Sequence, residues 1–246
     1  MGDGELHGKT ALVTGGGRRI GRQIALALAA VGADVAISYL KSENEARQTA
    51  EEIRRNGVRG LALACDVRQE KSVLNAVQEI QKEFGGLDVL VNNAAIYQTV
   101  EFEKITVQQW DEMFATNVRG PFLMSQAALK SLRQRRGRII HLGSLGGLRP
   151  WATHAHYCAS KAALTMLTQV MAKALAPEVA VNCVAPGMID LGDGRDAGLL
   201  RRLAAKTPMQ RNGGAEEVVR AVMFFATAPQ FITGQVLAVD GGLGLE

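Results

Sequence analysis

Short apolar runs alternate with longer amphipathic stretches along almost the whole chain. The short runs are rich in β-branched residues and predict strands at Lys9–Thr14, Asp34–Ser38, Leu61–Ala64, Leu87–Asn92, Arg138–Leu142, Val179–Val184 and Gln235–Val239. In the longer stretches apolar residues recur with the helical period, which predicts helices at Ile20–Val31, Glu43–Asn56, Ser72–Phe84, Val107–Gln134, Tyr157–Leu175 and Glu216–Ala226.

Several predicted strands, such as Val89–Val91, are apolar at consecutive positions, which indicates parallel strands covered on both faces. Strand–helix alternation over the whole length predicts right-handed βαβ crossovers. We therefore expect an α/β fold, with residues 1–246 forming a single domain. Its doubly wound parallel sheet, of Rossmann type, would have about seven strands and helices on both faces.

Two segments interrupt this alternation: Gly143–Ala155 after the fifth strand and Ala185–Gly214 after the sixth. The second contains a short helical pattern at Ala197–Lys206. Both follow the carboxyl ends of strands, where open α/β sheets bind ligands. We interpret the second as a substrate lid.

The composition is that of a globular protein, with 47% hydrophobic and 21% charged residues. The net charge of +4 is spread along the chain, which argues against nucleic-acid binding. The cysteines Cys65, Cys158 and Cys183 lack metal-site spacing, so we expect reduced thiols and no metal. The polar Met1–Gly8 segment is unlike a signal peptide, and no apolar run suits a membrane. We therefore predict a cytoplasmic location.

A glycine-rich loop, Thr14–Gly21, lies at the first strand–helix junction. Glycines allow the backbone to approach a pyrophosphate closely, and the helix N-terminus supplies amide donors. We expect the loop to bind a dinucleotide through Gly15, Gly17, Arg18, Arg19, Ile20 and Gly21. Arg19 stands where a middle glycine would be expected.

The end of the second strand predicts which dinucleotide is bound. The segment Tyr39–Ser42 has no carboxylate to bind a ribose 2′-hydroxyl, whereas Lys41 and the two loop arginines suit a 2′-phosphate. Tyr39, Lys41 and Ser42 are therefore candidate cofactor residues. They favour NADP(H) over NAD(H).

Tyr157 and Lys161 stand four residues apart in a predicted helix, and so share one face. A fixed ammonium beside a phenol favours the phenolate, so we expect Lys161 to lower the pKa of Tyr157. Such a pair alone is common on solvated helix surfaces. With Ser144 thirteen residues upstream and a nucleotide loop, it predicts a hydride-transfer site.

From Lys9 to Gly242 the chain resembles the short-chain dehydrogenase/reductase family. The matching motifs, in order, are Thr14–Gly21, Asp66–Val67, Asn92–Ala95, Asn117, Ser144, Tyr157 with Lys161, Pro186–Gly187, Gly234–Val236 and Asp240–Gly242. For the cofactor, the resemblance implies that Asp66 and Val67 contact adenine. It places Asn93 and Ala94 at the adenosine ribose, and Pro186, Gly187 and Ile189 beside the nicotinamide. Ala95 and Tyr157 are further candidate cofactor residues.

For the reaction, the resemblance implies that Tyr157 is the general acid and that Ser144 binds the developing alkoxide. Lys161 would hold the nicotinamide ribose. Asn117 would distort its helix and anchor a water that links Lys161 to solvent.

The implied activity is that of an NADPH-dependent carbonyl reductase. Within the family the chain is most similar to 3-oxoacyl-(acyl-carrier-protein) reductases, so the expected partners are a small carbonyl or alcohol substrate and an acyl carrier protein or CoA thioester. Arg135 matches a basic residue that docks the carrier. The stretch Ala176–Val179 lacks the second such residue, and Leu191 replaces a threonine common in relatives.

Other readings remain open. Arg18–Arg19 and Tyr39–Ser42 are similar to pteridine reductases, which commonly have aspartate where this chain has Ser144. Steroid, sugar and quinone substrates are also compatible. A non-catalytic NADP-binding sensor or scaffold would use the same fold, although such proteins usually lose the tyrosine or lysine.

The two long helices, Val107–Gln134 and Tyr157–Leu175, are apolar on more than one face. Together with the resemblance, this predicts a homotetramer formed through these helices and the C-terminal strand.

Overall fold

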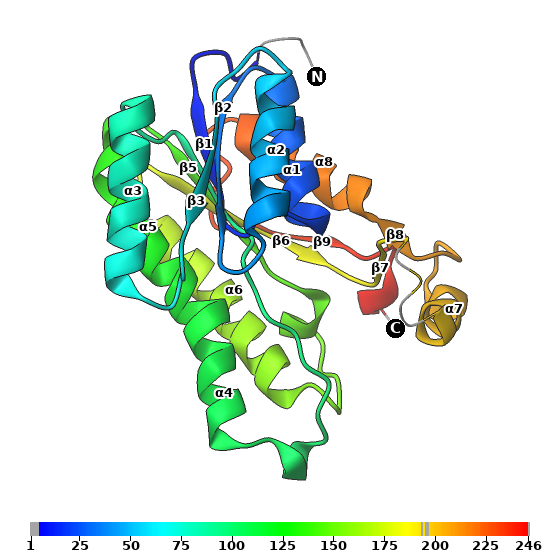
Figure 1. The fold of residues 1–246 in the computed structure, drawn as a ribbon. Coiled ribbons are helices and arrows are strands. Elements are labelled where there is room, and N and C mark those ends of the chain that lie inside the picture. Colours follow the sequence, from blue (N-terminus) through cyan, green and yellow to red (C-terminus); the bar gives the residue numbers. More distant parts are fainter. Residues whose placement is uncertain (1–4, 193, 195–196, 246) are drawn as a thin grey trace.

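The computed structural model describes residues 5–192, 194 and 197–245 (Figure 1). Seven parallel strands form its main sheet in the order β3-β2-β1-β4-β5-β6-β9. They are β1 (Thr10–Val13), β2 (Asp34–Tyr39), β3 (Gly60–Ala64), β4 (Val89–Asn92), β5 (Arg138–Leu142), β6 (Ala180–Pro186) and β9 (Val236–Val239). The strand order reverses between β1 and β4, which creates the switch point where ligands bind in such sheets.

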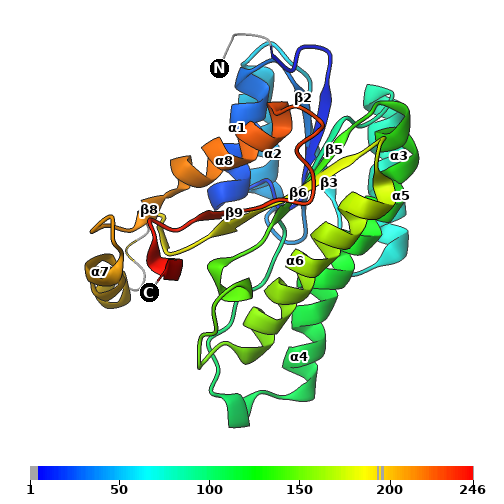
Figure 2. The same cartoon turned by 180° about the vertical axis from the view of Figure 1, so that it is seen from behind.

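Helices cover both faces of the sheet (Figures 1 and 2). One face carries α1 (Arg19–Ala30), α2 (Glu43–Arg54) and α8 (Ala215–Thr227), and the other carries α3 (Glu70–Phe84), α5 (Gly120–Gln134) and α6 (Ala155–Leu175). Helix α4 (Val107–Phe114) extends beyond the sheet and packs on α6. The predicted α/β fold with a parallel sheet is confirmed.

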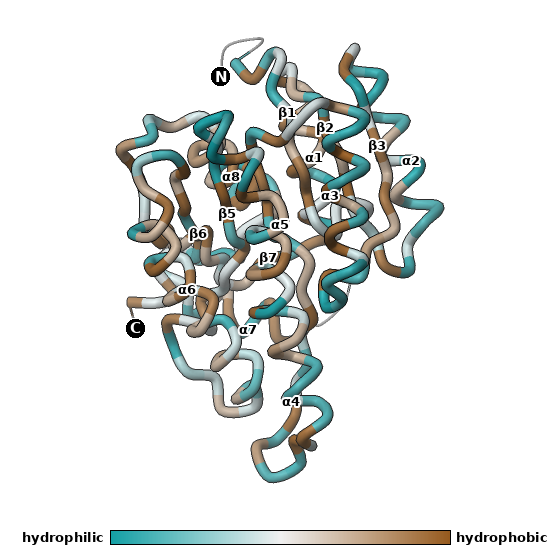
Figure 3. The backbone as a smooth tube through the Cα atoms, turned by 90° about the vertical axis from the view of Figure 1, so that its left-hand side faces the viewer, coloured by the Kyte–Doolittle hydropathy of each residue, from teal (hydrophilic) through white to brown (hydrophobic). Residues whose placement is uncertain are grey.

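The central strands β1 and β4 are mainly apolar and covered on both faces: all their residues are buried, including the polar Thr10 and Asn92. Hydrophobic segments run along the central strands, while α2 is largely hydrophilic (Figure 3). Two clusters of buried side chains, one on each face, make up the core.

The segment predicted as one helix, Val107–Gln134, is interrupted, so that prediction was wrong in detail. A π-helical turn, η2 (Ala115–Arg119), separates α4 from α5. Pro121 at the start of α5 has no amide hydrogen to donate to the carbonyl one turn earlier, which loosens the helical ladder there.

The segment after β6 also differs from a simple loop. It contains β7 (Ile189–Asp190), which pairs with β8 (Gly213–Gly214), and α7 (Ala197–Lys206), which has the predicted bounds. Three residues of the predicted lid, Asp193, Arg195 and Asp196, lie outside the described residues. Three further short elements are 3-10 turns: η1 (Phe102–Lys104), η3 (Leu145–Gly147) and η4 (Leu243–Leu245).

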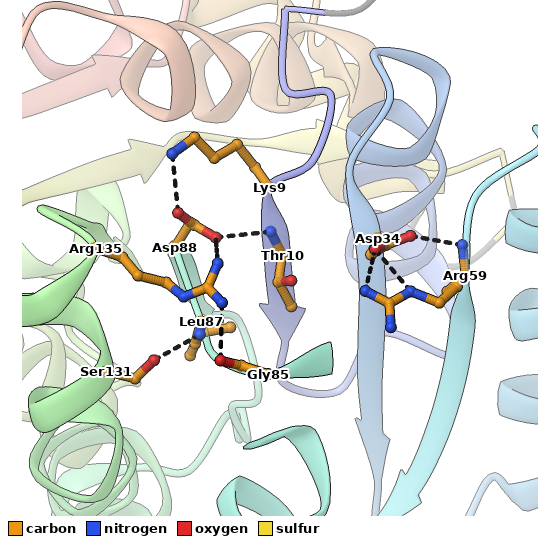
Figure 4. A network of polar contacts seen from close by, with 9 residues as sticks. All are labelled: Lys9, Thr10, Asp34, Arg59, Gly85, Leu87, Asp88, Ser131 and Arg135. Carbon is orange, nitrogen blue, oxygen red and sulfur yellow. Dashed lines mark hydrogen bonds and ion pairs between the residues drawn. The ribbon is translucent and has the colours of Figure 1, made fainter. Parts of the chain in front are cut away.

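A polar network joins the amino ends of β1 and β4 (Figure 4). The Asp88 carboxylate, 5% exposed, accepts hydrogen bonds from Lys9 Nζ at 3.1 Å, from the Thr10 amide at 3.0 Å and from Arg135 at 3.1 Å. A second, more exposed pair joins Asp34, the first residue of β2, to Arg59, which directly precedes β3. These charges lie at the amino-terminal ends of the strands, away from their carboxyl ends.

Candidate active site

A cleft of about 730 Å³ opens at the carboxyl ends of β1 to β4. Most predicted cofactor residues line it: Gly15, Arg18, Arg19, Ile20, Gly21, Tyr39, Lys41, Ser42, Asp66, Val67, Asn93, Ala94 and Ala95. The cleft therefore lies at the switch point of the sheet, as expected for a dinucleotide site.

The glycine-rich loop has the backbone that close approach requires. Gly15 adopts a positive φ of 63°. A Cβ on Gly21 would lie 2.5 Å from both the Asn93 side-chain nitrogen and the Gly15 carbonyl oxygen, so only glycine fits. The side-chain Nδ2 of Asn93 in turn donates a hydrogen bond to the carbonyl of Thr14 at 2.8 Å. This bond connects the loop after β1 to the loop after β4.

The N-terminus of α1 is suited to an anion. Its N-cap, Arg18, makes no side-chain cap, and the first turn has no acidic residue. The amide donors and the positive end of the helix dipole therefore face the cleft uncompensated by a carboxylate of that turn. This donor set fits a pyrophosphate.

The backbone conformation of Arg19 shows how an arginine fits where the loop pattern would have a glycine. It has a φ of 51°, in the left-handed region where glycine is normally preferred. The chain therefore keeps the loop conformation while placing a second guanidinium beside Arg18 in the cleft lining. Lys41 also lines this cleft, so its lining includes the cations Arg18, Arg19 and Lys41.

The predicted adenine residue Asp66 is held by Arg68, which the sequence reasoning missed. The Arg68 guanidinium donates to Asp66 at 2.8 and 2.9 Å, and to Glu112 of α4 at 3.2 Å. The hydrogen bond from Arg68 is the main reason why the pKa of Asp66 is lowered. The other residues of the lining that were not predicted are Ser38, Leu40, Cys65, Ile96, Glu112, Thr116 and Leu191. A basic side chain directly after Asp66–Val67 was the available signal for Arg68.

Six predicted cofactor residues do not line this cleft: Tyr157 and Lys161, which are described below, and four others. Gly17 packs behind the loop, where a Cβ would approach Ala46 to 3.1 Å. Pro186 ends β6, the Gly187 amide donates to Val239 at 2.9 Å, and Ile189 lies in β7. The last three are grouped beyond the cleft at the carboxyl end of β6.

Ser144, Tyr157 and Lys161 come together beside β5. Ser144 follows this strand, and its Oγ accepts a hydrogen bond from the Gly146 amide at 3.1 Å. Ser144 also acts on the Tyr157 side chain, where its hydroxyl favours a lower pKa. Lys161 Nζ lies 5.9 Å from the centre of the Tyr157 ring and donates to the Leu142 carbonyl at 2.7 Å.

We expected Lys161 to lower the pKa of Tyr157, but the residues of the chain itself raise it. Burial raises the pKa of Tyr157 to about 12, although the Ser144 hydroxyl opposes this shift. Burial also lowers the pKa of Lys161 to about 8. Both groups lose hydration in their charged forms, and Lys161 directs its hydrogen bond to Leu142.

Asn117 lies in the π-helical turn and is buried. Its Oδ1 accepts from the Ile96 amide at 2.9 Å, and its Nδ2 contacts the Ile96 carbonyl at 3.0 Å and Ser160 Oγ at 3.1 Å. The predicted helix distortion is confirmed. The predicted water link to Lys161 stays a prediction.

Arg135 does not lie at this site. It ends α5 and binds Asp88 and the Gly85 carbonyl at the amino-terminal edge of the sheet (Figure 4). Its guanidinium is thus used in a structural network with a buried carboxylate. A docking role for Arg135 would have to coexist with these bonds.

Fold and site together define a class, the dinucleotide-dependent α/β oxidoreductases. A sequence family described as Enoyl-(Acyl carrier protein) reductase matches residues 16–244. The chain is 38% identical to the 3-oxoacyl-(acyl-carrier-protein) reductase FabG of Staphylococcus aureus (strain Mu50), covering 96% of this chain and 98% of that one. The chain belongs to the short-chain dehydrogenase/reductase family.

Solved structures agree. A double mutant of a Serratia marcescens short-chain dehydrogenase/reductase superposes with a TM-score of 0.92 at 37% identity, covering 98% of this chain and 99% of that one. A gluconate 5-dehydrogenase from Burkholderia cenocepacia J2315, in complex with NADP and tartrate, gives 0.92 at 33% identity, with coverages of 99% and 98%. Among the helices that the structure describes, none has the length and apolar character needed to cross a bilayer.

Proposed function

We propose that the protein is an NADPH-dependent carbonyl reductase acting on 3-oxoacyl compounds. The observation that carries this proposal is the grouping of Ser144, Tyr157 and the buried Lys161 beside β5, in a chain whose dinucleotide cleft lies at the switch point of the same sheet. The similarity to 3-oxoacyl-(acyl-carrier-protein) reductases supports the substrate class.

NADPH, when bound, would supply the hydride for the carbonyl carbon, so that the products would be NADP⁺ and a secondary alcohol. Tyr157 is protonated at neutral pH because its pKa is near 12, so its hydroxyl can donate the proton that the carbonyl oxygen needs. Ser144 Oγ donates a hydrogen bond to the same oxygen and stabilises its developing negative charge. Lys161 would hold the nicotinamide ribose, and Asn117 keeps the π-helical turn in register with α6 through Ser160.

The cleft supports the cofactor assignment. The amides at the start of α1 would hold the pyrophosphate, and Arg18, Arg19 and Lys41 would hold the 2′-phosphate. Asp66 and Val67 would contact adenine, and Asn93 with Ala94 and Ala95 the adenosine ribose. Pro186, Gly187 and Ile189 would flank the nicotinamide.

We also propose a homotetramer. Phe122 on α5 is 44% exposed, and Met166 and Val170 on α6 are 59% and 54% exposed. Apolar side chains of this size on neighbouring helices favour burial against another copy of the chain. Sedimentation at micromolar concentration tests this, and a monomer would contradict it.

The test of function follows NADPH oxidation with acetoacetyl-CoA, with NADH and a dihydropterin in parallel. Tyr157→Phe should lower kcat by about 10²-fold or more while leaving the Kd for NADPH within about twofold. Absence of turnover with every carbonyl tested, together with tight NADPH binding, would instead identify a sensor or scaffold. Faster turnover of the dihydropterin would identify a pteridine reductase.

A further inference from the structure

The Tyr157 ring belongs to a group of four aromatic rings, each of which packs on two of the others. Tyr97 meets Tyr157 edge to face, with centroids 4.9 Å apart, and stacks on His154 at 5.0 Å. Trp151 lies nearly parallel to Tyr157 at 6.2 Å and meets His154 edge to face at 5.5 Å. These separations lie within the range of attractive aromatic pairs. We call Tyr97, Trp151, His154 and Tyr157 the ring box.

The ring box is held in place by hydrogen bonds between two loops. His154 Nε2 lies 2.5 Å from the Tyr97 hydroxyl, and its Nδ1 lies 3.0 Å from Thr153 Oγ1. A neutral imidazole with its hydrogen on Nδ1 satisfies both partners, and burial lowers the pKa of His154, which keeps the ring neutral. The Val100 amide also donates to the Thr153 carbonyl at 2.9 Å. Tyr97 is therefore a positioned side chain, although it is 51% exposed.

The ring box adjoins the space that a substrate must occupy. Tyr97 follows Ala94–Ile96, which line the cofactor cleft, so it lies just past that wall. Trp151 packs against Gly146, whose amide binds Ser144 Oγ. A carbonyl that accepts hydrogen bonds from Tyr157 and Ser144 would lie beside Tyr97 and Trp151, because both rings pack on the Tyr157 ring.

We propose that the ring box selects 3-oxo compounds that carry a planar ring directly on the reducible carbonyl. This inference rests on the proposed reduction at Tyr157. Flat ring faces and edges complement another ring, whereas a flexible alkyl chain loses rotamer freedom to lie against them. One ring–ring contact corresponds to about a two- to tenfold preference.

The test compares two esters that differ only at the ketone: ethyl benzoylacetate, with a phenyl group, and ethyl 3-oxohexanoate, with a propyl group. Their ratio of kcat/KM with NADPH is measured in the wild type, Tyr97→Leu and Tyr97→Phe. Phe231→Leu is the matched control, because Phe231 is fully exposed and lies outside the ring box. Using the ratio removes the intrinsic difference in reactivity between the two ketones.

We expect Tyr97→Leu to lower kcat/KM for the phenyl ester about three- to tenfold and that for the propyl ester less than twofold. Tyr97→Phe keeps the aromatic ring, so it should retain at least half of the selectivity that Tyr97→Leu loses. Phe231→Leu should leave the phenyl-to-propyl ratio of kcat/KM unchanged. If Tyr97→Leu affects both esters equally, or neither, the proposed selection by the ring box is wrong, while the proposed reductase function stands. If the wild type reduces neither ester nor acetoacetyl-CoA, the proposed function fails and the inference fails with it.

A binding measurement gives a readout that is independent of turnover. The chain has two tryptophans, Trp110 and Trp151, so Trp110→Phe leaves Trp151 as the fluorescent reporter. Ethyl 3-hydroxy-3-phenylpropanoate should change this emission with a lower Kd than ethyl 3-hydroxyhexanoate. Equal Kd values for the two alcohols would contradict selection by the rings.

Discussion

Lys161 Nζ donates a 2.7 Å hydrogen bond to the carbonyl of Leu142, at the end of β5, while lying 5.9 Å from the centre of the Tyr157 ring. The ammonium is thus buried against backbone. Burial lowers its pKa to about 8, so at neutral pH the folded chain holds a charge that would be better solvated in the unfolded chain. Burial of the Lys161 ammonium therefore destabilises the folded chain while it positions a cation at the site.

We therefore predict that Lys161→Met stabilises the protein while abolishing turnover. The pKa change from 10.5 to about 8 corresponds to roughly 3 kcal/mol of destabilisation of the wild type at neutral pH. The variant avoids this penalty but loses about 1 kcal/mol, because the Leu142 carbonyl no longer has a hydrogen-bond donor. Urea unfolding at pH 7.5 should show the variant about 2 kcal/mol more stable. Lys173→Met, on the exposed face of the same helix, should change stability by less than about 0.5 kcal/mol.

The pH dependence has a definite sign. The folded pKa of Lys161 lies below its unfolded value, so the penalty is present below about pH 8 and disappears as the pH rises to 10.5. The wild type should gain stability relative to Lys161→Met across that window. A constant difference between the two proteins would show that the buried charge is not its source.

Arg19→Gly should separate cofactor choice from loop structure. Glycine relieves the positive φ at this position, and the entropy that it adds to the unfolded chain offsets the gain, so stability should change by less than about 1 kcal/mol. Loss of a charged partner for the 2′-phosphate should raise KM for NADPH about tenfold. KM for NADH should stay within twofold, and an equal rise for both cofactors would place Arg19 at the pyrophosphate.

The outline of this site was predictable because its determinants are local. The apolar run Arg138–Leu142 and the helical period of Ala197–Lys206 predicted β5 and α7 with the observed bounds. The π-helical turn was different, because it depends on Pro121 and on bonds between Asn117 and Ile96, which are 21 residues apart. Spacing along a helix likewise placed Lys161 near Tyr157 but could not show that Leu142 takes its hydrogen bond.

The Asp88 network should act on stability alone. Asp88→Asn removes a buried carboxylate that serves Lys9 and Arg135, and should cost about 3 kcal/mol in urea unfolding (Figure 4). Asp34→Asn, at the more exposed pair with Arg59, should cost about 1 kcal/mol. Because both lie at the amino ends of the strands, kcat/KM for acetoacetyl-CoA should be unchanged. A large loss of kcat/KM in folded Asp88→Asn would connect this network to the substrate.

His141 on β5 should make the protein sensitive to acid. Thr168 Oγ1 donates to the Leu164 carbonyl, so it accepts the hydrogen of His141 Nδ1 at 2.9 Å. The buried Nε2 has no hydrogen-bond partner among the described residues. Burial, aided by the charge of Lys161, lowers the pKa of His141 to about 3. The neutral ring is compatible with the fold, and the protonated ring is not.

The sign follows from the lowered pKa. Below its unfolded value of 6.5 the unfolded chain takes up the proton first, so stability falls by roughly 1.4 kcal/mol per pH unit from 6.5 towards 3. Between pH 6.5 and pH 5 the loss due to His141 is about 2 kcal/mol. His141→Asn keeps a donor for Thr168 but cannot titrate, so urea unfolding should show about 2 kcal/mol less loss than in the wild type. His7→Gln, at an exposed position, is the control and should behave as the wild type does; if His141→Asn also matches the wild type, the acid sensitivity arises elsewhere.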